Sequence, residues 1–291
     1  MIKRIGIYFS FVRFSHTVFA LPFALAGALL AAQHQRGPNA FLGPFVANVG
    51  WILVAMVAAR SAAMAFNRLV DARLDALNPR TANRELPRGV MTMREAVAFV
   101  AAASLVFVYA AWRLSPLCLA LSPVALAIVF WYSLAKRYTT WTQLFLGLAM
   151  AVAPVGGWLA AGGRGGSEPW LLALAIGTWV GGFDVLYACQ DVEFDRAHGL
   201  RSIPARFGVR TALWISRAMH VVAVTSLLAL AWVTPLGRIY EAGVAVVAGM
   251  LVYEQSLVSV DDLSQVKRAF DLNGYVGILY LLVLAASVLR F

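Results

Sequence analysis

Residues 95–134 read EAVAFVAAASLVFVYAAWRLSPLCLALSPVALAIVFWYSL, and this stretch decides the fold class. It holds two apolar runs separated by little more than Ser115-Pro116. Each run is about 20 residues long, which is the length of a helix that crosses a lipid bilayer. The stretch therefore predicts two membrane-spanning helices joined by a tight turn.

Apolar runs of this kind recur along the whole chain. Of its 291 residues, 61% are hydrophobic and 13% are charged, whereas an ordinary soluble domain carries about 25% charged residues. The mean hydropathy is +0.76. This composition excludes a disordered chain, and a count of two cysteines excludes a disulfide scaffold. We expect nine spans, at residues 14–32, 45–66, 95–113, 116–134, 141–161, 169–189, 211–232, 237–257 and 273–289. The sequence thus predicts an all-α polytopic membrane protein, with one domain over residues 1–291. Its nine transmembrane helices would surround a central cavity that opens to the cytoplasmic face.

The distribution of charge sets the expected orientation. The formal net charge is +10, which in a soluble protein would suggest nucleic acid. Membrane proteins instead concentrate Lys and Arg in cytoplasmic segments. With the N-terminus in the cytoplasm, 17 Lys and Arg residues fall in inside segments and 5 in outside segments. We therefore expect an integral protein of the cytoplasmic (inner) membrane, with its C-terminus outside. The lipid bilayer is its expected partner and nucleic acid is not; the sequence leaves protein partners open.

Two inside loops, residues 67–94 and 190–210, follow spans that end in acidic side chains. In the first window Asn67, Asp71 and Asp75 are spaced i, i+4, i+8, so a helix places all three on one face. In the second window Asp184, Asp191 and Asp195 follow the same spacing rule, with Tyr187 or Ala188 between them.

Such acidic stripes need compensation. Like charges at i, i+4 destabilise a helix, and carboxylates at its C-terminal end oppose the helix dipole. Mg²⁺ binds carboxylates together with substrate phosphate oxygens, so two facing stripes indicate a metal and diphosphate site. The alternative is that these carboxylates pair with the many arginines of the two loops.

Two further features suit an anionic substrate. Tyr132 and Lys136 are spaced i, i+4 and can point at one site, with Arg137 following. Arg60 lies two helical turns before Asn67, inside the expected span. A charged residue within a span indicates a functional site, although Arg60 could also pair with Asp184 or with another span.

Long stretches around these residues resemble a known family. Asn67-x3-Asp71-x3-Asp75 with Arg80-Thr81-Ala82-Asn83-Arg84-Glu85-Leu86-Pro87-Arg88-Gly89 resembles the first motif of UbiA-type intramembrane aromatic prenyltransferases. The second motif is matched by Tyr187-Ala188-Cys189-Gln190-Asp191-x3-Asp195 followed by residues 199–208, and the loop after the fourth span by Tyr132-x3-Lys136-Arg137. The resemblance covers essentially the whole chain.

The resemblance implies a Mg²⁺-dependent transfer of a polyprenyl group from a polyprenyl diphosphate to an aromatic acid. It implies Mg²⁺ between Asn67, Asp71 and Asp75 on one side and Asp191 and Asp195 on the other. The remaining implied site residues bind the diphosphate or the acceptor, and they are Lys136, Arg84, Arg137, Arg73, Arg201, Tyr132 and Tyr187. Asp191 or Asp184 would polarise the phenol of the acceptor, and Arg60 or Arg137 would bind its carboxylate.

The acceptor itself stays open within the family. The resemblance points first to 4-hydroxybenzoate, prenylated ortho to its hydroxyl in ubiquinone biosynthesis. Arg68 stands where many members carry Asp after the Asn, and Arg201 where many carry Lys. The stretch from Ala65 to Pro79 is closer to a sister group linked to the futalosine route to menaquinone, so a dihydroxynaphthoate-type acceptor is the alternative.

A secondary transporter is the alternative outside enzymes, because such proteins also carry charges within spans and two related halves. Their binding sites lie near the midplane of the membrane. The carboxylates of this chain cluster at helix ends on one side, which favours the enzyme.

Overall fold

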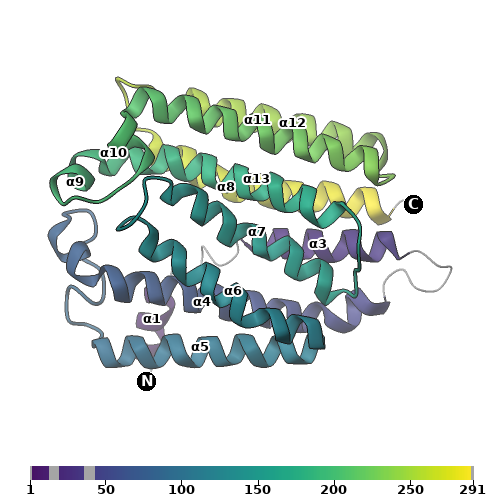
Figure 1. Ribbon diagram of the computed structural model, residues 1–291, viewed down its shortest axis with the longest axis horizontal. Helices are drawn as coiled ribbons and strands as arrows, with labels where there is room; N and C mark the ends of the chain where they lie inside the picture. The colour runs from purple at the N-terminus through teal and green to yellow at the C-terminus, as the bar shows by residue number, and fades with distance from the viewer. Residues whose placement is uncertain (1, 13–19, 36–42, 290–291) are drawn as a thin grey trace.

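The computed structural model describes residues 2–12, 20–35 and 43–289. The described part is helical and has no strand. Long helices lie side by side along one axis, with the short helices α9 and α10 at the end that also carries the loop after α4 (Figure 1). The long helices are α3 (Leu21–His34), α4 (Gly43–Leu77), α5 (Met93–Leu114), α6 (Pro116–Ala135), α7 (Thr142–Ala160), α8 (Glu168–Ala188), α11 (Val209–Val233), α12 (Gly237–Ser256) and α13 (Val266–Leu289). The shorter elements are α1 (Ile2–Phe11), the 3-10 turn η1 (Cys189–Asp191), α9 (Val192–Ala197) and α10 (Ile203–Phe207).

Seven helices of the described chain are long and apolar enough to cross a membrane: α4, α5, α6, α7, α8, α11 and α13. They coincide with seven of the nine expected spans. The expected span at 14–32 corresponds to α3, an apolar helix of 14 residues, which is shorter than the other spans. Residues 14–19 of the expected span lie outside the described part. The expected span at 237–257 corresponds to α12, which has the length but carries Arg238, Glu241 and Glu254.

The predicted hairpin of α5 and α6 is confirmed. Pro116 occupies the first turn of α6, where its missing N–H costs nothing, and the Ser115 hydroxyl accepts the N–H of Cys118 as an N-cap. At the other end of α5, Thr92 and Glu95 form a capping box. Both helices bury few side chains, which suits helices that face lipid.

One expected boundary is wrong. We expected the first motif loop to begin at residue 67, but α4 continues as a helix to Leu77. The extra turns carry Asp71 and Asp75, whose repulsion is offset because each carboxylate meets a cation from elsewhere in the chain. The helix therefore projects its acidic face beyond the apolar segment.

The main core is built from α3, α7, α8, α11, α12 and α13, with Trp158, Trp179, Tyr240 and Tyr280 fully buried. Helices α3 and α7 approach closely, since a Cβ at Gly27 would stand 2.0 Å from the carbonyl oxygen of Pro154. Beside this core, and lined in part by its residues, an apolar cavity of about 680 Å³ lies among α4, α5, α6, α7 and α8. Among its lining residues Arg60 is the one charged side chain, and Tyr132, Ser122 and Thr178 carry hydroxyls.

Candidate functional site

The end of α4 presents a carboxylate held by two cations. The Nζ of Lys136 lies 2.6 Å from Oδ2 of Asp71, and Nη2 of Arg137 lies 2.7 Å from Oδ1. The Asp71 side chain is only 4% exposed, and the Asn67 amide one turn earlier donates to it at 3.5 Å. Lys136 and Arg137 follow the end of α6, so packing of α6 against α4 creates this cluster.

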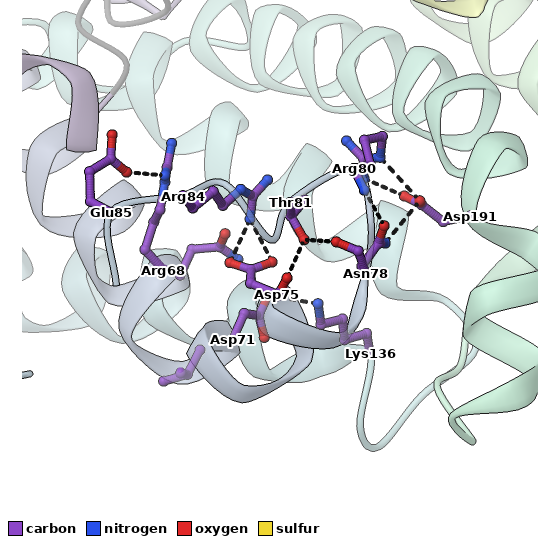
Figure 2. Close-up of polar contacts among 12 residues, drawn as sticks. Arg68, Asp71, Asp75, Asn78, Arg80, Thr81, Arg84, Glu85, Lys136 and Asp191 are labelled. Carbon is purple, nitrogen blue, oxygen red and sulfur yellow. Dashed lines mark hydrogen bonds and ion pairs between the residues drawn. The ribbon is translucent and has the colours of Figure 1, made fainter. Parts of the chain in front are cut away.

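The loop after α4 folds back over the helix end. Nη1 of Arg84 donates to both carboxylate oxygens of Asp75, at 2.8 and 2.7 Å. The Thr81 hydroxyl donates to the backbone carbonyl of Asp75 at 3.1 Å. Asp75 is therefore compensated by a residue only nine positions away (Figure 2).

Arg80 joins the two motif regions. Its Nη2 lies 2.6 Å from Oδ2 of Asp191, its Nε donates to Oδ1 at 3.2 Å, and its Nη1 donates to the Tyr187 hydroxyl at 3.0 Å. Figure 2 shows Arg80 reaching from the loop after α4 to Asp191 across the site. Burial by itself would lower the pKa of the Arg80 guanidinium. The charge of Asp191, with smaller contributions from Tyr187 and Asp75, outweighs burial, so the pKa is raised.

Arg80 is the site residue that the sequence analysis did not single out. It stood in the quoted first motif, among several arginines with the same local context. Nothing in the spacing of residues 80–88 distinguishes the arginine that crosses to the second motif from the others.

The second motif departs from the predicted continuous stripe. Helix α8 ends at Ala188, Asp191 lies in the 3-10 turn, and Asp195 lies on the separate helix α9. Asp184, Asp191 and Asp195 therefore do not share the face of one unbroken α-helix. The Asp195 carboxylate accepts the Ser202 hydroxyl at 2.8 Å. Asp184 is half-buried, and no hydrogen bond to it is found within the described part of the chain.

Two expected arginines lie apart from the carboxylates. Arg73 is exposed on α4 and has no ion pair or hydrogen bond among the described residues. Nη1 of Arg201 donates to the backbone carbonyl of Tyr138 at 2.5 Å. Its backbone N–H donates to the carbonyl of Lys136 at 2.8 Å, so Arg201 joins the second motif to the loop after α6 without pairing with an acidic side chain there.

Arg60 and Tyr132 both line the cavity. The Nε of Arg60 is buried and has no hydrogen-bond partner, and the expected alternative of an ion pair with Asp184 is not formed. The Tyr132 hydroxyl lies within electrostatic range of Arg60, Asp184 and Asp71. Arg60 is half-buried beside an otherwise apolar lining, and a charge there without a partner is costly, so this part of the cavity is suited to an anionic group.

The motif carboxylates are the right type of ligand for a hard divalent cation, but their oxygens are paired with Lys and Arg side chains. Carboxylate oxygens are the ligands that Mg²⁺ prefers. Within the described ranges, however, no three Asp, Glu, His or Cys side chains come close enough together to hold a metal ion. Asp71, Asp75 and Asp191 each hold a Lys or Arg instead, as the alternative of internal pairing anticipated. A ligand with its own negative charge would have to draw these cations away before the oxygens could meet a metal.

Comparison with known proteins adds a family to this geometry. The model of the UbiA prenyltransferase family matches residues 20–282. A 4-hydroxybenzoate octaprenyltransferase of Aliivibrio fischeri strain MJ11 is 31% identical over 237 residues, which cover 81% of this chain and 82% of the relative. A 4-hydroxybenzoate octaprenyltransferase of Citrobacter koseri is 34% identical, over 81% of this chain and 83% of the relative.

Solved structures agree with the fold. The apo structure of a UbiA homologue from Aeropyrum pernix K1 has a TM-score of 0.82 and 37% identity, over 95% of this chain and 98% of that one. A UbiA homologue from Archaeoglobus fulgidus, bound to GPP and Mg²⁺, has a TM-score of 0.71 at 20% identity, over 97% and 99% of the two chains.

Proposed function

This chain belongs to the UbiA prenyltransferase family, and from that premise we propose that it transfers a polyprenyl group from a polyprenyl diphosphate to 4-hydroxybenzoate. The new bond forms ortho to the hydroxyl, as a step of ubiquinone biosynthesis. The relatives of 31–34% identity that bear the name 4-hydroxybenzoate octaprenyltransferase support this acceptor. The whole of residues 1–291 acts as one UbiA-like domain.

The observation that carries the proposal is a cluster of cations one helical turn beyond Tyr132, which lines the apolar cavity and lies within electrostatic range of Asp71. Lys136, Arg137, Arg84 and Arg80 surround the carboxylates there. A diphosphate head would take the cations and the cavity would hold the start of the prenyl tail. Lys and Arg side chains bind a diphosphate through charge-assisted hydrogen bonds.

The same carboxylates fit Mg²⁺ once the diphosphate has drawn their cations away. Asn67, Asp71, Asp75, Asp191 and Asp195 would hold it. Bound there, the metal neutralises diphosphate charge and so assists departure of the leaving group. That a UbiA homologue of the same fold has been solved with GPP and Mg²⁺ supports the use of a divalent metal.

The residues of the chain then serve two needs of the reaction before the new bond forms. The cations stabilise the leaving diphosphate. The apolar wall of the cavity keeps water from the allylic cation that its departure leaves. The ring attacks that cation and then loses a proton from the carbon that formed the bond.

The geometry favours one residue in each pair that the sequence left open. Arg60 faces the cavity without a partner, whereas Arg137 is bound to Asp71 and to a backbone carbonyl. Arg60 is therefore the candidate for the acceptor carboxylate. Asp184 is free of cations in the described chain, whereas Asp191 holds Arg80, so Asp184 is the candidate that polarises the phenol.

The finer membrane arrangement belongs to the same proposal. Nine helices cross the inner membrane, with α3 and α12 added to the seven apolar ones. The N-terminus and the carboxylate end lie on the cytoplasmic side, the cavity opens to that side, and the C-terminus lies outside. The excess of Lys and Arg in the segments expected on the cytoplasmic side supports this orientation.

A turnover assay on membranes that contain the protein tests the function. Mg²⁺ and a polyprenyl diphosphate are supplied with either 4-hydroxybenzoate or a dihydroxynaphthoate, and products are identified by mass spectrometry, with EDTA-treated membranes as a control. Prenylated 4-hydroxybenzoate that disappears with EDTA is the expected result. Product from the naphthoate alone would move the protein to the menaquinone route. No product from either acceptor, with folded protein and varied tail length, would reject the transfer and favour the transporter.

A further inference from the structure

We propose that Arg68 and Glu85 form a tether that keeps residues 78–92, the arginine loop, over the end of α4 while the motif carboxylates change partners. The step that the tether serves rests on the proposed function. The contacts that define it do not, since they join side chains of this chain to one another.

The arginine loop is attached to α4 at three points. Thr81 and Arg84 both bind Asp75, through its carbonyl and its carboxylate. The third attachment is an ion pair between Nη1 of Arg68 and Oε2 of Glu85, at 2.6 Å. Figure 2 shows this pair beside the cluster of Asp71 and Asp75, with the Arg68 side chain directed to Glu85.

The three attachments differ in what a substrate would do to them. Arg84 holds a carboxylate that the proposed metal would claim, and Arg84 itself is a ligand for the diphosphate, so that contact has to be exchanged. The pair of Arg68 and Glu85 contains none of the proposed metal ligands. It can therefore persist through the exchange and keep Arg84, the neighbour of Glu85 in sequence, within reach of the diphosphate.

The surroundings of the pair suit a permanent contact. The side chains of Arg68 and Glu85 are only 5% and 14% exposed. Helix α1 covers them: the Ser10 hydroxyl donates to Oε1 of Glu85 at 2.6 Å, and the Phe11 ring lies 5.9 Å from the Arg68 guanidinium. Exclusion of water strengthens a charged hydrogen bond.

Helix α1 is itself fixed to the same region. Phe11 is fully buried against Ala65, Met91 and Ala96, and its ring meets Phe99 edge to face. Glu85 also closes the far end of the loop, because its backbone carbonyl accepts the N–H of Val90 at 3.0 Å. Arg68 and Glu85 are thus positioning residues, and α1 is the strap that shields them.

The test compares Glu85→Gln with Glu241→Gln, an exposed glutamate on α12 without a partner in the described chain. The first measurement is the rate of tryptic cleavage after Arg80 and Arg88 in lipid nanodiscs, followed by mass spectrometry. The second is the Kd for inorganic diphosphate in the presence of Mg²⁺. The third is the pair of KM values, for the prenyl diphosphate and for the acceptor.

Loss of the charged contact is expected to speed cleavage of the arginine loop about tenfold and to weaken diphosphate binding by about the same factor. The KM for the prenyl diphosphate rises in parallel, while the KM for the acceptor stays unchanged. Glu85→Asp, which keeps the charge, recovers part of each effect, and Glu241→Gln matches the parent protein. If Glu85→Gln does not fold, Ser10→Ala gives the same comparison with a smaller expected change.

Two results separate the tether from the function. Equal cleavage and equal diphosphate affinity in Glu85→Gln and Glu241→Gln would overturn the tether. Accelerated cleavage in Glu85→Gln, in a protein that transfers no prenyl group, would leave the tether standing and reject the proposed function.

Discussion

The two motif regions have the same kinds of side chains but opposite internal organisation. The first, at the end of α4 with the arginine loop, keeps its carboxylates on one unbroken helix and gives each a Lys or Arg partner. The second, from Asp184 to Gly208, breaks into a turn and two short helices. Asp71 is 4% exposed, whereas Asp191 is 21% exposed and draws its cation from the first region.

The difference indicates a division of labour. A fully paired set of carboxylates is preorganised and close to neutral, so it can receive a diphosphate by exchanging partners. Within the described chain, the ion pair found for the second region is with Arg80 of the first, and in the proposed function Asp184 is left to act on the acceptor. The comparison predicts that damage to the bridge between them costs most, and damage within one region costs less.

The largest expected effect is on the bridge. Asp191→Asn removes the charge that holds Arg80 and one proposed metal ligand, so turnover should fall about 10³-fold, the loss that follows removal of one key electrostatic group. The measurement is prenyl transfer in membranes at saturating Mg²⁺. Glu193→Gln, two residues away and exposed on α9, is the matched control. Its turnover should stay within about twofold of the parent value, since substitutions of exposed side chains generally have small effects. Turnover above a tenth of the parent value in Asp191→Asn would break the comparison.

The next effect concerns the acceptor side. Arg60→Gln should raise the KM for 4-hydroxybenzoate by about 10- to 100-fold, because a charged hydrogen bond contributes roughly 1.5–3 kcal/mol. The KM for the prenyl diphosphate should change little, since the ion pairs of the motif carboxylates are made by other cations than Arg60. Steady-state kinetics with each substrate varied in turn checks this.

Arg60→Lys sharpens the same test. A lysine keeps the charge but loses the planar pair of donors that matches a carboxylate, so it should recover only part of the affinity. A rise in both KM values together would instead place Arg60 with the diphosphate and remove its assigned role.

A third effect follows from the paired state of the first region. Mg²⁺ alone should bind weakly, because Lys136, Arg137 and Arg84 already occupy the carboxylates. Inorganic diphosphate should strengthen metal binding about tenfold, and by reciprocity Mg²⁺ should strengthen diphosphate binding by the same factor. Titration calorimetry in both orders measures the two factors, and independent binding of metal and diphosphate would argue against partner exchange.

The smallest effect compares the helix caps of the two regions. The Ser202 side chain caps α10 and also donates to Asp195. The Thr92 side chain caps α5, and the side-chain hydrogen bonds found for it in the described chain are with Glu95. Each change to Ala should cost about 1 kcal/mol of stability, read as a small fall in the midpoint of thermal unfolding. Only Ser202→Ala should also lower turnover, by about twofold. Because a tenfold change corresponds to about 1.4 kcal/mol, this effect is a fraction of a kcal/mol. Equal turnover in both variants would separate Asp195 from the site.

Much of this protein is encoded locally. The apolar lengths predicted the spanning helices, and the tight turn at Ser115-Pro116 is confirmed, because both depend only on neighbouring residues. The spacing of Asn67, Asp71 and Asp75 on one helix face is likewise local. The end of α4 was not predictable in the same way: the helix passes residue 67 because cations from outside it offset the charges.

The sequence by itself determined the class of molecule, the two acidic windows and the arginine within an apolar span, since periodicity and composition act over a few turns. Only the tertiary structure decided which cation meets which carboxylate. Asp71 meets Lys136 and Arg80 meets Asp191, pairs 65 and 111 residues apart that exist only after α4, α6 and α8 pack together. Coulomb attraction within a few ångströms depends on position in space, and position along the chain does not provide it.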